Sequence, residues 1–152
     1  MFRRAEWVWE FFGFESIQDG RPVQDWYDGL PISHKTEIVI LLLYLRNLTS
    51  TAWDRPFFDS LKGEGGISEI LVPDIRDERG VAYYRVYGYF GPGKQMYTFL
   101  HATNKKVRND KHGKGIAKHR LKQLQDGRAT IHKFNFEERP LGEPTRQCGR
   151  KN

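Results

Sequence analysis

The chain contains a single cysteine among its 152 residues, Cys148, which lies close to the C-terminus. One cysteine forms no internal disulfide, and it excludes a zinc site built from several cysteines of the chain. The histidines at His101, His112, His119 and His132 are also spaced too loosely to predict a zinc site. We therefore expect no disulfide framework, no bound metal and no other cofactor.

Long hydrophobic runs are also missing. The longest, Ile38–Leu45, is far shorter than the roughly 20 apolar residues that span a bilayer. Glu6 and Glu10 interrupt the aromatic start of the chain, so a signal peptide is not predicted. The glycines within 63–66 are not followed by Gly-Lys-Ser or Gly-Lys-Thr, which argues against a phosphate-binding loop. We expect a cytoplasmic protein without a membrane partner.

What the sequence does contain fits one folded domain. The length suffices for a substantial core, and an aromatic content of 14% argues against general disorder. From Arg139 onward Pro, Gly, Arg and Lys dominate. We therefore predict a single domain over residues 1–136 and a disordered tail over residues 137–152.

Positive charge is concentrated in one part of the chain. The net charge is +6, and the segment from 101 to 133 holds ten cations against two anions. These cations are Lys105, Lys106, Arg108, Lys111, Lys114, Lys118, Arg120, Lys122, Arg128 and Lys133. Such a concentration favours a face that binds a polyanion, most often a nucleic acid. A solvated basic helix is the alternative.

The most informative stretch runs from Val81 to Leu124. Aromatic and β-branched residues dominate from Tyr83 to Phe90, Gly91–Gly93 predicts a reversal, and residues 95–102 form a second strand. We predict an antiparallel hairpin whose second strand ends in a cationic patch, Asn104–Arg108. A rigid sheet presents side chains to a ligand at such strand ends.

The remaining segments predict an α+β fold. Strands are expected at about 7–14, 67–72, 81–90 and 95–102, and residues 130–136 form either a further strand or an extended arm. Helices are expected from Pro22 to Asp28, closed by Gly29 or Pro31, from about 34 to 48 with Ser33 as N-cap, and from Lys114 to Gln125. Residues 55–63 are interpreted as a flexible link.

The motif YYRVYGYF, the short turn, the strand ending in FLHATNKK and the Lys-rich helix that follows resemble the RelE/HigB superfamily, and more narrowly its phage-derived HigB-like branch. The resemblance covers about residues 6–124. It implies a small twisted antiparallel sheet of about four strands, an N-terminal helical hairpin on one face and a C-terminal basic helix. It also implies a toxin of a type II toxin–antitoxin system, which cleaves mRNA on the ribosome without a metal and binds a helix-turn-helix antitoxin.

Within that resemblance, Arg85 matches a phosphate-binding arginine and Lys105–Lys106 match a basic pair at the end of the fourth strand. In the chemistry implied, the ribose 2′-oxygen attacks the adjacent phosphate, and an acid protonates the leaving 5′-oxygen. The acid–base side chain is expected among His101, Arg108, Lys111 and His112, which the sequence does not rank.

The sequence departs from the family pattern at two points. No tyrosine follows Tyr97, and Glu69–Leu71 stands where the family has Glu-Leu-Arg. One phosphate contact is therefore lost or moved to Arg76. RNA binding is expected from Arg76, Arg108, Lys111, Lys114 and Lys118, and the RNA partners are mRNA and ribosomal RNA.

Each assignment has an alternative without catalysis. Arg85 pairs with a carboxylate across the sheet, the two lysines are ordinary turn residues, and His101 is a hydrogen-bonded strand histidine. The same fold includes ParE-like gyrase inhibitors, and a basic face also suits a phage nucleic-acid-binding protein. The departures at Tyr97 and Glu69–Leu71 favour such a non-enzymatic module.

Overall fold

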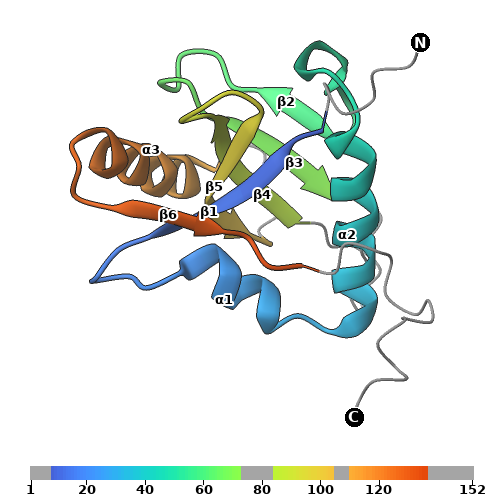
Figure 1. Cartoon of the computed structure of the whole chain (residues 1–152), viewed down its shortest axis with the longest axis horizontal. Coiled ribbons are helices and arrows are strands. Elements are labelled where there is room, and N and C mark those ends of the chain that lie inside the picture. The colour runs from blue at the N-terminus through green and yellow to red at the C-terminus, as the bar shows by residue number, and fades with distance from the viewer. Residues whose placement is uncertain (1–7, 73–83, 105–109, 137–152) are drawn as a thin grey trace.

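The computed structural model describes residues 8–72, 84–104 and 110–136, which form an α+β fold of three α-helices and a six-stranded sheet (Figure 1). In chain order the elements are β1 (Glu10–Glu15), α1 (Pro22–Asp28), α2 (Ile32–Arg46), a 3-10 turn (Ser50–Ala52), β2 (Phe58–Ser60), β3 (Ser68–Val72), β4 (Tyr84–Phe90), β5 (Met96–Thr103), α3 (Lys111–Gln125) and β6 (Thr130–Lys133).

The sheet is mixed and has the order β2-β3-β4-β5-β1-β6. β1 runs parallel to β5, whereas the other neighbours are antiparallel. The prediction of an antiparallel sheet of about four strands was therefore wrong in both respects. The two strands beyond the predicted four lie at the edges. β2 lies in residues 55–63, which the sequence predicted to be a flexible link. Of the two possibilities for residues 130–136, a strand or an extended arm, residues 130–133 form the strand β6.

The sheet separates two layers of helices (Figure 1). α1 packs on β1 and β5, and α2 packs on β3, so both cover one face, as the sequence predicted for the segment 22–48. α3 covers β4 and β5 from the opposite face. The first face carries a large aromatic core that includes Trp9, Phe11, Trp53, Phe99 and Phe134. The second face carries a much smaller apolar cluster around Tyr87, Leu100 and Leu121.

α2 begins at Ile32, and Pro31 is its N-cap. Ser33 lies in the first turn and makes no capping hydrogen bond, so its prediction as the N-cap was wrong. Pro31 itself is extended, with φ −61° and ψ 153°, and its carbonyl accepts from the backbone N–H of His34 at 3.0 Å. No helix of the described residues, α2 included, is long and apolar enough to cross a membrane.

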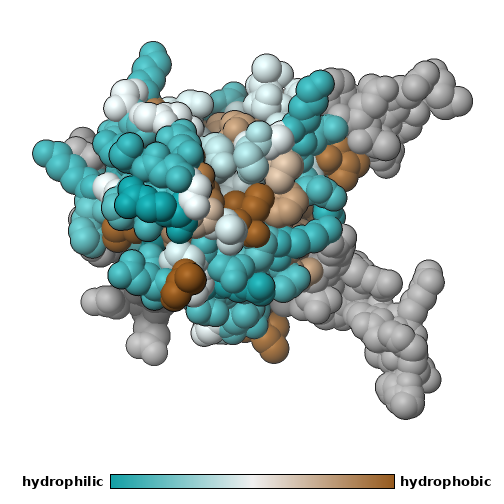
Figure 2. Space-filling model, turned by 60° about the vertical axis from the view of Figure 1, so that its left-hand side comes forward, coloured by the Kyte–Doolittle hydropathy of each residue, from teal (hydrophilic) through white to brown (hydrophobic). Residues whose placement is uncertain are grey.

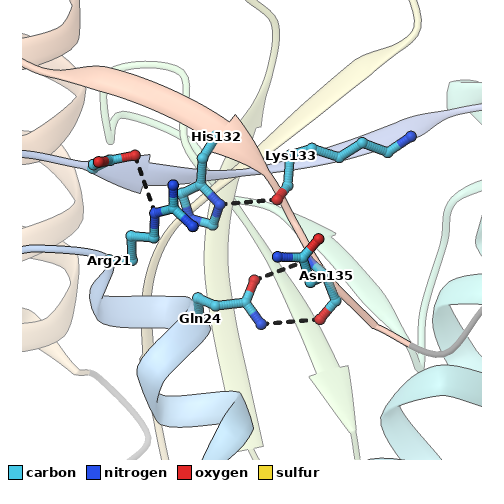
Figure 3. A network of polar contacts seen from close by, with 6 residues as sticks. Arg21, Gln24, His132, Lys133 and Asn135 are labelled. Atoms are coloured by element: carbon cyan, nitrogen blue, oxygen red, sulfur yellow. Dashed lines mark hydrogen bonds and ion pairs between the residues drawn. The ribbon is translucent and has the colours of Figure 1, made fainter.

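β6 is fastened to α1 by a side-chain clamp (Figure 3). The Gln24 amide donates to the backbone carbonyl of Asn135 at 2.9 Å and accepts from its N–H at 2.8 Å. His132 packs over Gly13, where an added Cβ would lie 2.7 Å from Nε2 of the ring. A larger residue at position 13 would therefore require the His132 ring to shift.

Candidate functional site

A row of polar side chains crosses the α3 face of the sheet. Asp59 of β2 lies opposite Glu69 of β3, Glu69 lies opposite Tyr87 of β4, and Tyr87 lies opposite His101 of β5. Directly opposed residues share one face of a sheet and lie about 5 Å apart at Cβ. Arg85 lies two residues before Tyr87, on the same face of β4. We call Asp59, Glu69, Tyr87 and His101 the polar row.

A β-bulge brings His101 into the polar row. Tyr87 pairs with His101 but the next residue, Gly88, pairs with Phe99, so Leu100 is the extra residue of β5. Without the bulge, strict alternation would place His101 on the α1/α2 side with Phe99. Instead the rings of Tyr87 and His101 are parallel within 1°, with centroids 6.2 Å apart.

Gly88 is the sequence signal for this bulge. A Cβ at this position would lie 2.5 Å from the carbonyl oxygen of Thr98 and 2.5 Å from the ring of Tyr97. Glycine inside a strand marks a bulge or a close approach of two backbones. The signal is present in YYRVYGYF, although strand alternation alone does not reveal it.

Glu69 is the site residue that sequence reasoning missed. Its side chain is 8% exposed, and Oε1 has no hydrogen-bond partner among the described residues. Burial raises the pKa of this carboxyl above its ordinary value of 4.5, and the positive charges of Arg85 and Lys114 partly oppose that shift. A buried carboxyl with a raised pKa beside an arginine is typical of a functional site.

Arg85, which the resemblance matches to a phosphate-binding arginine, is only 6% exposed. Its charge acts on Glu69, and its side chain hydrogen-bonds with Tyr87. Arg85 is buried because the register of β3 and β4 places Glu69 and Tyr87 next to it, on a face of the sheet that α3 partly covers. In the alternative without catalysis, Arg85 pairs with a carboxylate across the sheet. The effect of the Arg85 charge on Glu69 of the neighbouring strand agrees with that alternative.

The N-terminus of α3 is fixed to the polar row by Asp110. Its Oδ2 accepts from the Tyr87 hydroxyl at 3.0 Å, and its Oδ1 accepts from the Gly113 N–H at 3.0 Å as the N-cap of α3. Burial, together with the carboxylate of Asp110, raises the pKa of Tyr87 and keeps its hydroxyl protonated. The helix begins at Lys111, three residues earlier than predicted, because this cap was not recognised.

The described cations of α3 lie on different sides of the helix. Lys114 and Lys118 form ion pairs with Glu64, whereas Lys111 and His112 line a different part of the helix surface. His112 lines a groove between α3 and the β1–α1 loop, together with Gln18, Asp19, Lys111, Gly115, Ile116, His119, Arg120 and Gln123. The structure therefore places His112 in this groove and His101 in the polar row. This side of the molecule is mostly hydrophilic (Figure 2).

Four predicted residues, Arg76, Lys105, Lys106 and Arg108, lie outside the described residues. The strands that flank them do end beside the polar row. Val72, the last residue of β3, pairs with Tyr84, and Thr103, the last residue of β5, pairs with Arg85. The chain thus leaves the sheet next to Arg85 at both places.

Among the described residues, no three histidine, cysteine, aspartate or glutamate side chains are grouped so as to hold a metal ion. Comparison with models of known protein families, with curated proteins and with solved structures finds no match. The polar row is therefore the feature of the molecule from which its chemistry is inferred.

Proposed function

We propose that the chain is an endoribonuclease that cleaves RNA by attack of a ribose 2′-hydroxyl, with Glu69, Arg85 and His101 as its centre. The supporting observation is that these three side chains come from three neighbouring strands and share one face of the sheet. A carboxylate, a guanidinium and an imidazole fill the three roles that this reaction needs. No metal is required for the reaction so written.

In the proposed reaction, Glu69 accepts the proton of the 2′-hydroxyl, and the 2′-oxygen forms a bond to phosphorus. Arg85 holds the negative charge that develops on the phosphate oxygens. The bond from phosphorus to the 5′-oxygen then breaks, and the His101 imidazolium donates a proton to that oxygen. The products are a 2′,3′-cyclic phosphate and a 5′-hydroxyl.

The raised pKa of Glu69 and the partial exposure of His101 support the roles proposed for these two residues. The raised pKa of Glu69 brings this base closer to neutral pH, where proton transfer is most effective. His101 is partly exposed, so its ring is accessible from the solvent side of the row. Tyr87 stacks on that ring and is itself fixed by Asp110, which orients the imidazole.

The biological setting follows from the resemblance of YYRVYGYF and FLHATNKK to RelE/HigB toxins. We propose that the substrate is mRNA in the ribosome and that a helix-turn-helix antitoxin neutralises the protein. Lys105, Lys106 and Arg108 would supply further phosphate contacts, since the strand that precedes them ends beside Arg85.

Translation of a defined mRNA on purified ribosomes tests this proposal. The wild type should cut the mRNA, and His101→Ala should slow cleavage by about 10²- to 10⁴-fold, as loss of a general acid does. Lys94→Ala is the control, because Lys94 is exposed in the turn between β4 and β5 and should leave the rate unchanged. Equal cleavage by wild type and His101→Ala would remove the polar row from the mechanism.

A binding module without catalysis is the second candidate. The observation that favours it is the burial of Arg85 against Glu69, which balances the charge of the guanidinium without a phosphate. In that case the wild type would bind ribosomes or nucleic acid and arrest growth while the mRNA stays intact. Growth arrest with relaxed or damaged DNA would indicate action on gyrase.

A further inference from the structure

Glu64, in the loop between β2 and β3, bridges two lysines of α3. Its Oε1 lies 2.8 Å from Nζ of Lys118, and its Oε2 lies 3.9 Å from Nζ of Lys114. The hydrogen bond from Lys118 lowers the pKa of Glu64 most. Burial opposes this shift, and the positive charges of Lys118 and Lys114 lower the pKa further. One anionic group therefore sits between two ammonium groups that are one helical turn apart.

The rest of this loop is held weakly. Its glycines, Gly63, Gly65 and Gly66, all have positive φ, at 74°, 74° and 95°. The backbone hydrogen bonds Leu61 N–H to the Ile67 carbonyl and Glu64 N–H to the Leu61 carbonyl are both 3.4 Å long, beyond the usual range for strong bonds. The ion pairs of the Glu64 carboxylate with Lys118 and Lys114 are the polar contacts that the structure gives between this loop and α3.

Lys114 also lies beside the polar row, because the preceding residue, Gly113, packs against the ring of Tyr87, where an added Cβ would lie 3.0 Å from Cε2. The charge of Lys114 acts on Glu69, the proposed base. An anion held by Lys114 and Lys118 would therefore lie near the proposed centre, because Lys114 acts on Glu69 as well. A phosphate neighbouring the scissile one is an anion that RNA would supply at that position.

We infer that Lys114 and Lys118 form a subsite for an RNA phosphate next to the scissile bond, and that Glu64 occupies this subsite until RNA displaces it. The inference rests on the proposed function in taking RNA as the ligand. The carboxylate and the phosphate are both anionic oxygen acceptors for the same two ammonium groups. RNA binding then requires that the glycine-rich loop release Glu64.

Binding of a cleavage-resistant 2′-O-methyl RNA, measured by fluorescence anisotropy over a range of salt concentrations, tests this inference. Glu64→Gln should tighten binding about two- to fivefold at low salt, because an exposed ion pair of ordinary strength no longer competes. The slope of log K against log salt should steepen by about 0.7 for each additional phosphate that the lysines neutralise. Adding Lys118→Ala should abolish both effects.

Asp126→Asn is the matched control. Asp126 lies at the other end of α3 and pairs with Lys122 and Arg128 at 3.7 and 3.1 Å, so its replacement also removes one negative charge that pairs with cations of this region. If Glu64→Gln binds no better than Asp126→Asn, or binds worse and melts lower, Glu64 is a structural tie and the inference is wrong.

The mRNA cleavage assay separates this inference from the proposed function. Cleavage by the wild type without tighter RNA binding by Glu64→Gln would overturn the subsite alone. Tighter and more salt-sensitive binding by Glu64→Gln in a protein that cuts no mRNA would support the subsite and overturn the proposed endoribonuclease.

Discussion

The two faces of one sheet are built in opposite ways. On the α1/α2 face, aromatic rings contact each other directly, with Trp53 5.3 Å from Trp9, 5.1 Å from Phe90 and 5.2 Å from Tyr97 between centroids. On the α3 face, a small apolar cluster borders buried Glu69, Arg85 and Asp110. Burying charge is unfavourable, whereas apolar residues of similar size would close this face at no such cost.

This contrast separates the face that holds the large aromatic core from the face that carries the proposed centre. The strands are shared, so the rigidity that the aromatic face gives to β3, β4 and β5 also fixes Glu69, Arg85 and His101 on the other side. Substitutions on the two faces should therefore separate stability from activity.

Trp53→Ala should be the most destabilising change, at about 3–5 kcal/mol, because it empties a large site in the aromatic core. Trp53 is buried, and its indole N–H also donates to the carbonyl of Leu45 at 2.9 Å. Urea unfolding followed by circular dichroism measures the loss. A loss under about 1 kcal/mol, the size of an ordinary point-mutation effect, would show that the aromatic face is not the main source of stability.

Leu121→Ala tests the opposite face and should cost about 2–3 kcal/mol, at the low end for a buried leucine. Leu121 belongs to the smaller cluster, whose neighbours Leu124 and Ala129 are only partly buried and can relax into the space. The same urea titration provides the value. If Leu121→Ala lowered the free energy of unfolding as much as Trp53→Ala does, the two faces would contribute equally to stability, which would contradict the comparison.

Asp110→Ala should cost about 1–2 kcal/mol through loss of the N-cap of α3, and it also leaves the buried Tyr87 hydroxyl without this acceptor. Combining it with Tyr87→Phe should be less than additive, since both variants break the same hydrogen bond. Thermal unfolding of the two single variants and the double variant measures the coupling. Strict additivity would contradict the link between α3 and the polar row.

Glu69→Gln should raise the melting temperature at pH 7 by a few degrees while it abolishes cleavage. Burial raises the pKa of Glu69, so the favourable contribution of its protonated form is fully present below the ordinary pKa of 4.5 and is lost as the pH rises through the folded value. The advantage of the variant over wild type should therefore shrink as the pH falls through the folded pKa of Glu69 and be absent below pH 4.5. A lower melting temperature at pH 7 would show that the ionised carboxylate stabilises the fold.

Ser33→Ala should change stability by less than about 0.5 kcal/mol, because Ser33 makes no capping hydrogen bond. The sequence-based interpretation of Ser33 as the N-cap predicts a loss of about 1 kcal/mol instead. Differential scanning calorimetry distinguishes the two values.

Local patterns in the sequence predicted what depends on neighbours along the chain. The hairpin of β4 and β5 follows from the aromatic and β-branched residues and the Gly91–Gly93 turn, and α1 begins at Pro22 and ends before Gly29 as expected. The order of the strands was not predicted, because the pairing of β1 with β5 joins residues far apart in the chain. β2 was missed because three residues are too short for a periodic pattern.

The site was predicted in part for the same reason. Arg85 and His101 were recognised from their motifs, but their shared face depends on a bulge that alternation alone does not reveal. Glu69 was overlooked because its importance comes from burial beside Arg85, which only the packed sheet creates. His112 was a reasonable candidate by sequence, yet the cap at Asp110 starts α3 earlier and the side chain lines a separate groove.

The chemical nature of the cut ends would show most clearly whether the polar row promotes a 2′-hydroxyl attack. Mass spectrometry of mRNA fragments from programmed ribosomes should show a 2′,3′-cyclic phosphate after wild-type treatment, and none after treatment with Glu69→Gln or when the nucleotide 5′ to the cut is 2′-deoxy. Fragments that persist with the deoxy substrate, or that Glu69→Gln produces at the wild-type rate, would contradict this chemistry.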